Sequence, residues 1–404
     1  MHPEAPIIRS RIRSTPVPAY LGGFLFIGIA LSLAGPALSH LRDRVHTDDG
    51  GIAWIFVGQS AGYIAGSVFA GPGLDGGRGH RRWIVAMVIA TASVGLIAVA
   101  PTLLLLVAAF ALLGWACGMC DVSGNTLVMW SRPAGSGALL NGLHLCFALG
   151  AMVTPLLVDR SLHLAGSVWG VALPMAALTA VCASLMVPHA SPVRTRLAAV
   201  VHRTAGGARG LQVGAICAFF FCYVAMEMAF ANWIHTYVEQ IGYGDAVTAT
   251  GVTSMFGLGF ATGRVLAIWA ARRFSAGWIV ASTTAMSVVA SLLFVAFEGP
   301  GAMLWVVTFL FAISVAPQYA SMMAFAESHL ALSGRNTSAI VAGSGLGGLI
   351  MPWIVGQLFD AIGPQALPRI VAVLAVATAA VGAFGGRLLT GQRPPVTSMN
   401  APVT

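Results

Sequence analysis

The sequence predicts an all-α integral membrane protein with twelve transmembrane helices, arranged as two parallel-repeat halves of six helices each. Composition, length and an internal repeat carry this prediction. The 404 residues are 57% hydrophobic and only 8% charged, with a mean hydropathy of +0.85, whereas a soluble domain has roughly 25% charged residues. Because a span and its loop take roughly 30 to 35 residues, the chain has room for about twelve spans.

Apolar segments of spanning length follow one another along the chain, separated by short charged or Pro/Gly-rich turns. The first six predicted spans are 18–41, 51–74, 81–100, 103–130, 137–158 and 165–187. The last six are 211–238, 246–271, 277–297, 301–325, 335–358 and 366–389. We therefore expect a cytoplasmic N-terminal tail (1–17), a six-helix bundle (18–187), a cytoplasmic linker (188–210), a second six-helix bundle (211–390) and a cytoplasmic C-terminal tail (391–404).

An offset of 197 residues superposes glycines and prolines of the two halves. It pairs Gly62 with Gly259, Gly66 with Gly263, Gly150 with Gly347 and Pro155 with Pro352. One offset that serves two separate helix pairs indicates a duplication. Since each copy holds an even number of spans, both copies enter the membrane from the same side.

The basic residues, all arginines, fix the expected orientation. With the N-terminus in the cytoplasm, 17 arginines fall on the inner side, Arg264 among them, and 4 on the outer side. The formal charge of +8 therefore reflects topology, and no nucleic-acid partner is expected. We expect a multi-pass protein of the plasma (inner) membrane, monomeric among membrane lipid, with both termini cytoplasmic. Its six cysteines lie in apolar spans and are expected to be buried thiols, so no cofactor or metal is predicted.

Two carboxylates lie well inside predicted spans, Asp121 in the fourth and Glu227 in the seventh. An acid near the bilayer centre costs roughly 2.5 to 3.5 kcal/mol on insertion scales, so it usually faces a cavity, finds a partner or serves transport. Asn125 shares a helix face with Asp121. His144 lies at a similar depth in the fifth span and is a candidate proton relay. We predict that these three residues and Asn141 form one polar cluster.

The second half supplies a different set of polar groups. Trp233 follows Glu227 by six residues and reaches the same cavity only if the helix unwinds. Gln318 and Tyr319 add neutral polar groups in the tenth span, and the offset of 197 places Gln318 opposite Asp121. The two positions read as one ancestral site that is charged in one half only.

The loop after the second span, GPGLDGGRGHRRW, is similar to the signature G-x-L-x-D-R-x-G-R-R of major facilitator transporters. The matching positions are Gly71, Asp75, Gly79, Arg81 and Arg82. The resemblance implies the major facilitator fold and a gating loop that stabilises one access state through charge and helix-end contacts.

Three further motifs resemble the branch of this superfamily that contains the fucose permease and the sodium-dependent glucose transporter. They are G-x-x-D-x-x-x-N at Gly118, Asp121 and Asn125, L-H-x-x-F-x-x-G-A-x-x-x-P from Leu143 to Pro155, and Y-V-x-x-E-x-x-x-x-x-W-I from Tyr223 to Ile234. The resemblance implies a secondary active transporter that moves a small polar solute, such as a sugar, by symport with a proton or sodium ion. It also implies a role in coupling and substrate recognition for Asp121.

These observations define the expected site. The expected ion-coupling residues are Asp121, His144 and Glu227, and the expected substrate-binding residues are Asn125, Asn141, Glu227, Trp233, Gln318 and Tyr319. Proton-coupled efflux of drug-like or amphipathic compounds stays open as an alternative, because aromatic and methionine residues outnumber neutral polar ones in the spans. A non-transporting receptor of the same fold also stays open. A membrane enzyme is not expected, since the spans contain no HExxH pattern.

Overall fold

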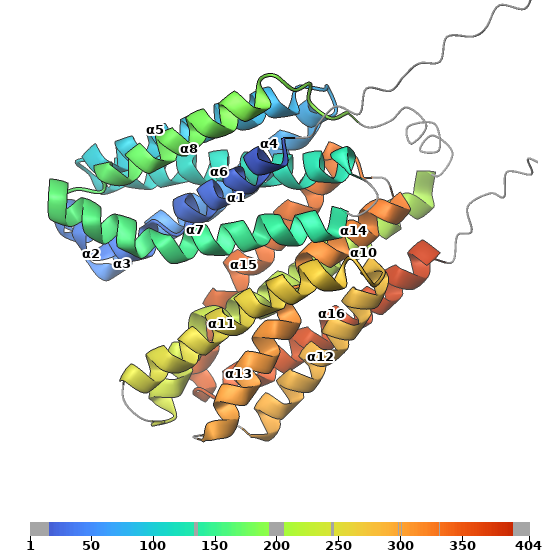
Figure 1. The fold of residues 1–404 in the computed structure, drawn as a ribbon. Coiled ribbons are helices and arrows are strands. Elements are labelled where there is room, and N and C mark those ends of the chain that lie inside the picture. The colour runs from blue at the N-terminus through green and yellow to red at the C-terminus, as the bar shows by residue number, and fades with distance from the viewer. Residues whose placement is uncertain are drawn as a thin grey trace, which may run out of the picture.

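The computed structural model describes residues 16–132, 136–193, 206–243, 246–297, 299, 301–330 and 332–390, and this part of the chain contains helices and no strand. The helices of the first half are α1 (Val17–Leu31), α2 (Ala34–Arg44), α3 (Asp49–Ile52), α4 (Trp54–Leu74), α5 (Gly79–Val99), α6 (Leu103–Ser131), α7 (Ser136–Ala165) and α8 (Trp169–Met186) (Figure 1). Those of the second half are α10 (Gly206–Gln240), α11 (Ala246–Ala270), α12 (Ala276–Ala296), α13 (Ala302–Val315), α14 (Gln318–Leu330), α15 (Gly334–Ile362) and α16 (Ala366–Thr390).

These helices form the twelve predicted spans. Most spans are single helices, but the first is α1 followed by α2 and the tenth is α13 followed by α14, with Pro317 at the second break. Eleven spans are long and apolar enough to cross a membrane. The twelfth, α4, is 21 residues long. Its hydropathy is lowered by polar side chains, including Gln59 and Tyr63.

The duplication predicted from the sequence is confirmed by the helix ends. Both ends of α5 (79–99) lie 197 residues before the ends of α12 (276–296), and α7 and α15 end at 165 and 362. The paired glycines also occupy matching crossings. A Cβ on Gly62 of α4 would collide with the carbonyl oxygen of Ala111 in α6, and a Cβ on Gly259 of α11 would crowd the carbonyl oxygen of Phe309 in α13. Small residues at such crossings let helix backbones approach closely in lipid.

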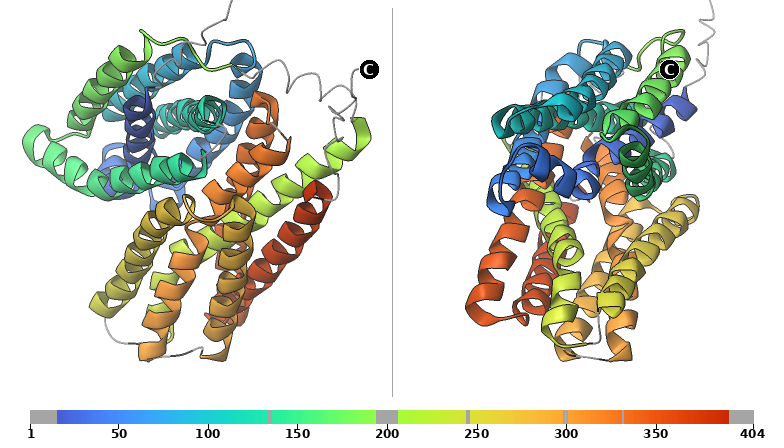
Figure 2. Two further views of the ribbon diagram at one scale, coloured as in Figure 1. Left: turned by 45° about the vertical axis from the view of Figure 1, so that its right-hand side comes forward. Right: turned by 90° about the vertical axis from the view of Figure 1, so that its left-hand side faces the viewer.

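The two halves meet at one end of the molecule and diverge toward the other (Figures 1 and 2). We call the end at which α8 finishes and α10 begins the linker end. Between the halves, α4 packs against α15, and α7 packs against α11 and α14. The predicted linker and tails lie largely outside the described residues.

Candidate functional site

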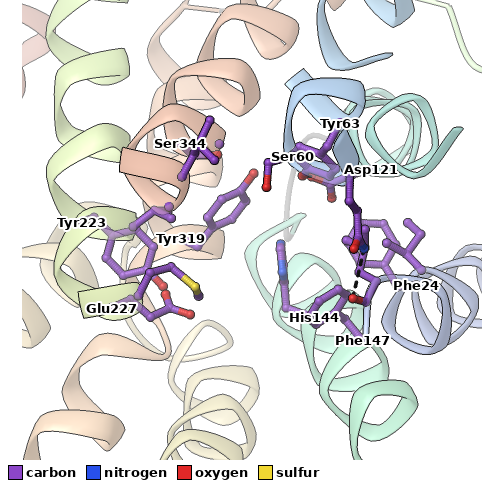
Figure 3. A pocket seen from close by; sticks show the side chains of 18 of the residues that line it. Phe24, Ser60, Tyr63, Asp121, His144, Phe147, Tyr223, Glu227, Tyr319 and Ser344 are labelled. Carbon is purple, nitrogen blue, oxygen red and sulfur yellow. Dashed lines mark hydrogen bonds between the residues drawn. The ribbon is translucent and has the colours of Figure 1, made fainter. Parts of the chain in front are cut away.

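A cavity of about 410 Å³ lies between the halves, lined by residues from α1, α4, α6 and α7 on one side and from α10, α11, α14 and α15 on the other. This volume is within the range of roughly 300 to 1,000 Å³ that is usual for small-molecule sites. Tyr319 and Ser344 of the second half face Ser60 and His144 of the first (Figure 3). The polar residues that line the cavity are Gln59, Ser60, Tyr63, Asp121, His144, Tyr223, Glu227, Arg264, Tyr319 and Ser344.

Asp121 in α6 is the most strongly bonded acid of the cavity. Its Oδ2 accepts a hydrogen bond of 2.5 Å from the hydroxyl of Tyr63, and its Oδ1 accepts one of 2.9 Å from Nδ2 of Asn125. The side chain is only 5% exposed. Gly118, one turn before Asp121, packs against the carbonyl of Tyr63, so the glycine crossing of α4 and α6 brings the phenol to the carboxylate. Both carboxylate oxygens are thus held by donors from the first half.

His144 of α7 reaches across the cavity to the second half. Its ring centroid is 4.6 Å from that of Tyr319 and 5.3 Å from that of Phe24, and its Nε2 is buried without a hydrogen-bond partner in the described structure. His144 therefore lies at the point where the two halves contact each other beside the cavity, with one ring nitrogen available to a solute or a proton.

Arg264 falls inside the predicted span 246–271, although the count of inner-side arginines includes it. It lies within α11, is 3% exposed and lines the cavity. Its guanidinium carbon lies 5.0 Å from the ring centroid of Phe260, and it is close enough to Glu227 and Tyr223 to interact electrostatically. A nearby carboxylate and an aromatic face stabilise a buried cation. The positive-inside count did not anticipate this role, because it only assigns each arginine to one side of the membrane.

The guanidinium of Arg264 keeps unused donors. Its Nε and Nη1 have no hydrogen-bond partner in the described part of the chain, and no salt bridge joins it there to Glu227. A buried donor without a partner is destabilising. These N–H groups are therefore available to a solute oxygen.

Two predicted residues of the first half lie behind the cavity wall. Asn125 does not line the cavity but fixes the carboxylate of Asp121. Asn141 is fully buried and donates to the carbonyl of Gly137 at 2.9 Å, one turn earlier in α7. The predicted cluster is therefore divided, with Asp121, Asn125 and His144 at or next to the cavity and Asn141 within helix packing.

Two predicted residues of the second half also lie away from the cavity. Gln318 is fully buried and donates to the hydroxyl of Ser287 in α12 at 3.2 Å. Trp233 donates from Nε1 to the carbonyl of Pro352 at 2.9 Å and packs between α10 and α15. The unwinding needed to turn Trp233 inward does not occur, because α10 is continuous from Gly206 to Gln240. Glu227 and Tyr319, in contrast, line the cavity.

Sequence reasoning missed the contribution of α4. Gln59, Ser60 and Tyr63 lie on neighbouring turns of one helix face and all line the cavity. A signal for them exists in the sequence, since α4 falls outside the set of strongly apolar spans and its polar residues recur at spacings of three and four.

The loop after α4 joins the two halves at the linker end. Asp75 Oδ1 accepts a hydrogen bond of 2.9 Å from the backbone N–H of Gly334, in the first turn of α15. Gly71 lies against the same turn, where a Cβ would collide with the carbonyl of Gly334. Trp130 at the end of α6 donates to the carbonyl of Leu332 at 3.0 Å. A carboxylate at a helix N-terminus is favoured by the helix dipole, so this contact between the two halves is stabilising.

Two of the other three predicted loop residues, Gly79 and Arg82, contact side chains of the first half. A Cβ on Gly79 would meet the side chain of Leu127 in α6, and the guanidinium of Arg82 lies 6.0 Å from the ring centroid of Phe69. Arg81 is exposed.

The sequence model of the Major Facilitator Superfamily matches residues 20–352. The chain belongs to the Major Facilitator Superfamily. It is thus a multi-pass membrane transporter rather than an enzyme, as the sequence predicted. The twelve-helix fold with two six-helix halves is the fold of this superfamily, and the predicted likeness to its fucose permease and glucose transporter branch is confirmed by the relatives below.

Two curated members of the superfamily are similar over most of the chain. The sodium-dependent glucose transporter 1 of Xenopus laevis is 26% identical over 358 residues, which cover 82% of this chain and 73% of that protein. The sodium-dependent glucose transporter 1A of Mus musculus is 26% identical over 372 residues, which cover 83% of this chain and 87% of that protein.

Solved structures of the superfamily share the fold. The transporter FucP in its outward conformation superposes with a TM-score of 0.76 at 17% identity, covering 93% of this chain and 99% of FucP. The proton:xylose symporter XylE bound to 6-bromo-6-deoxy-D-glucose superposes with a TM-score of 0.74 at 14% identity, covering 93% of this chain and 95% of XylE.

Proposed function

We propose that this transporter moves a sugar by ion-coupled symport, with the cavity between the halves opening alternately to each side of the membrane. The observation that carries the proposal is the carboxylate of Asp121, buried in the wall of a cavity that both halves line. The names of its relatives support the solute class, since they include sodium-dependent glucose transporters and a proton:xylose symporter.

The physical basis of coupling is the free energy required to enclose a charge away from water. When both halves close over the cavity, an ionised Asp121 loses its access to water, and its neutralisation by a proton or a cation favours closure. If solute and ion both favour the same closed state, each raises the affinity for the other. Asp121 accepts hydrogen bonds on both oxygens, from Tyr63 and Asn125. This arrangement favours a proton, which needs one oxygen, over sodium, which needs several oxygen ligands.

The solute would lie between the polar groups of the two halves. Sugar hydroxyls both donate and accept, and they would meet Ser60 and His144 on one side and Tyr319, Glu227 and Arg264 on the other. The aromatic residues of the wall would contact the apolar faces of a sugar ring. Asn125, Asn141, Gln318 and Trp233 would then support the site through helix packing rather than touch the solute.

We further propose that the linker end is cytoplasmic and that the protein resides in the plasma (inner) membrane. Seven of the arginines that support this orientation precede residue 16 or follow residue 193 outside the described ranges, and the remainder include Arg78, Arg81 and Arg82 beside the loop after α4. In this orientation the structure is closed toward the cytoplasm through Asp75 and Trp130.

Uptake by proteoliposomes tests the proposed function. We expect the purified protein to accumulate a labelled hexose or pentose when an inward proton gradient is imposed, and to accumulate less when an inward sodium gradient replaces it. A panel of sugars, with and without each gradient, would identify both solute and ion. Failure of every sugar to move under either gradient would refute symport of sugars.

Efflux of amphipathic compounds is the second candidate, and it is favoured by the aromatic wall. Phe24, Phe56, Phe147 and Phe260 all line the cavity. Under this alternative an outward flux of a fluorescent lipophilic cation would be driven by inward protons. The same proteoliposomes report this flux directly. Under an inward proton gradient, symport would move the solute inward, whereas efflux would move it outward.

Asp75→Asn is expected to weaken closure at the linker end. The amide keeps an oxygen for the N–H of Gly334 but loses the charge that favours a helix N-terminus. Spin labels at Gly76→Cys and Ser328→Cys, in a background without the native cysteines, report the distance between the two halves at the linker end. The Asp75→Asn variant should show an additional population at longer distance. Asp159→Asn at the opposite end is the matched control. An unchanged distance distribution in Asp75→Asn would contradict the gating role.

A further inference from the structure

A second cavity, of about 480 Å³, lies within the C-terminal half between α12, α14 and α16. It shares no lining residue with the cavity between the halves. Ala281, Ala285 and Ala383 at its rim are exposed on membrane-spanning helices, so the cavity opens on the lipid-facing side of the bundle.

The same region of the N-terminal half is filled by larger side chains. The offset of 197 pairs Val280 with Trp83, Gly277 with His80, Gly382 with Leu185 and Ala383 with Met186. Trp83 is fully buried and stacks on Tyr20 with a centroid distance of 5.4 Å. Because α5 and α12 begin and end at matching positions, the cavity reflects smaller residues at equivalent places rather than a different arrangement of helices. Because the cavity opens to the membrane, it is accessible to lipid.

Polar groups are placed at two depths of this cavity. The helix α16 continues to Thr390, seven residues beyond the position that matches the end of α8, and this extension carries Arg387 to the cavity at the linker end. Deeper in the span, Thr284 is 4% exposed and its Oγ1 has no hydrogen-bond partner in the described structure. The counterpart of Thr284 in the first half is the apolar Met87.

The charge at the cavity mouth is positive. Arg387 is exposed and forms no salt bridge with any acid in the described part of the chain. Arg272 and Arg273 lie in the turn just before α12, four or five residues from Gly277. An apolar space that opens to lipid, with a cationic rim at the membrane surface, is complementary to an anionic lipid.

We propose that this cavity binds an anionic phospholipid, with one acyl chain in the apolar space and the phosphate against Arg387. The guanidinium can donate two parallel hydrogen bonds to a phosphate. The hydroxyl of Thr284 is available to an oxygen of the bound lipid. The site is separate from the solute cavity, so the proposal does not depend on what the protein transports.

Native mass spectrometry of the purified full-length protein tests the proposal, with phosphatidylglycerol and phosphatidylcholine of identical acyl chains as probes. We expect the wild-type protein to retain phosphatidylglycerol about tenfold better, because this lipid has a net negative charge, whereas the choline cation of phosphatidylcholine is repelled by the arginines at the rim. Arg387→Ala should remove this preference. Val280→Trp, which introduces the residue of the other half, should reduce retention of both lipids.

Two matched variants control for surface charge and bulk. Arg160→Ala removes an exposed arginine at the other end of the membrane, and Val289→Trp adds a tryptophan at an exposed position of α12. Both should behave as wild type. Equal retention of the two lipids by the wild-type protein would overturn the proposal, as would a preference that Arg387→Ala leaves unchanged. Displacement of the lipid by glycerol 3-phosphate at equal concentration would show an anion site rather than a lipid site and would also overturn it.

Discussion

Asp121→Asn should reduce the accumulation of solute to a ratio of about 1, because a carrier whose solute and ion no longer influence each other only equilibrates the solute. The substituted side chain is neutral and of the same size, and its amide oxygen can still accept a hydrogen bond from the hydroxyl of Tyr63. Exchange of labelled for unlabelled solute at equal concentrations should therefore persist. Uptake and exchange measured on the same proteoliposomes separate loss of coupling from loss of binding.

Asp159→Asn is the appropriate control, since its side chain is 69% exposed and, among the residues that the structure describes, its ion pair is with His163 on the same helix. It should accumulate solute as the wild-type protein does. Gradient-driven accumulation that survives in Asp121→Asn would remove this acid from the coupling mechanism. Loss of both accumulation and exchange would instead assign Asp121 to solute binding.

Gly62→Val should prevent stable assembly of the N-terminal half. A Cβ at this position would collide with the carbonyl of Ala111 and crowd the backbone N of Trp115 in α6. Overpacking typically costs about 1 to 3 kcal/mol where side chains can adjust, and backbone against backbone leaves less room to adjust. We expect a large fall in the monodisperse fraction after mild heating in detergent, measured by fluorescence-detected size-exclusion chromatography.

Gly257→Val provides the matched control for this substitution. Gly257 also lies within a spanning helix, α11, but nothing stands within 4 Å of a Cβ built there. Its variant should retain the wild-type melting behaviour. Similar melting of Gly62→Val and wild type would mean that α4 and α6 can separate without loss of the fold.

The fold followed from the sequence because its determinants are local or periodic. Spans were visible as apolar segments, and the repeat was visible because Gly62 and Gly259 are needed at equivalent close crossings. The breaks between α1 and α2 and between α13 and α14 were not predicted. Both lie inside continuous apolar segments, where hydropathy carries no signal for a short interruption.

The site could be predicted only in part, because whether a side chain faces the cavity depends on the rotation of its helix and on partners from other helices. Asp121 and Glu227 were found because a buried acid stands out in an apolar span, and both line the cavity. Gln318 was placed by analogy with Asp121, yet a neutral amide can be satisfied within the bundle, as its bond to Ser287 shows. Arg264 was missed as a site residue because a count of arginines by membrane side does not show which of them lines a cavity.

The polar face of α4 also bears on how the chain enters the membrane. Gln59, Ser60 and Tyr63 serve the cavity, and they lower the hydropathy of the one span that falls outside the apolar set. A segment of marginal hydropathy partitions weakly into lipid by itself during synthesis. Its partner α6, against whose backbone its glycines pack, is made two spans later. We therefore expect α4 to become firmly inserted only after α6 has left the ribosome. Biogenesis of the N-terminal half would then be delayed at the insertion of the helix that shapes the binding cavity.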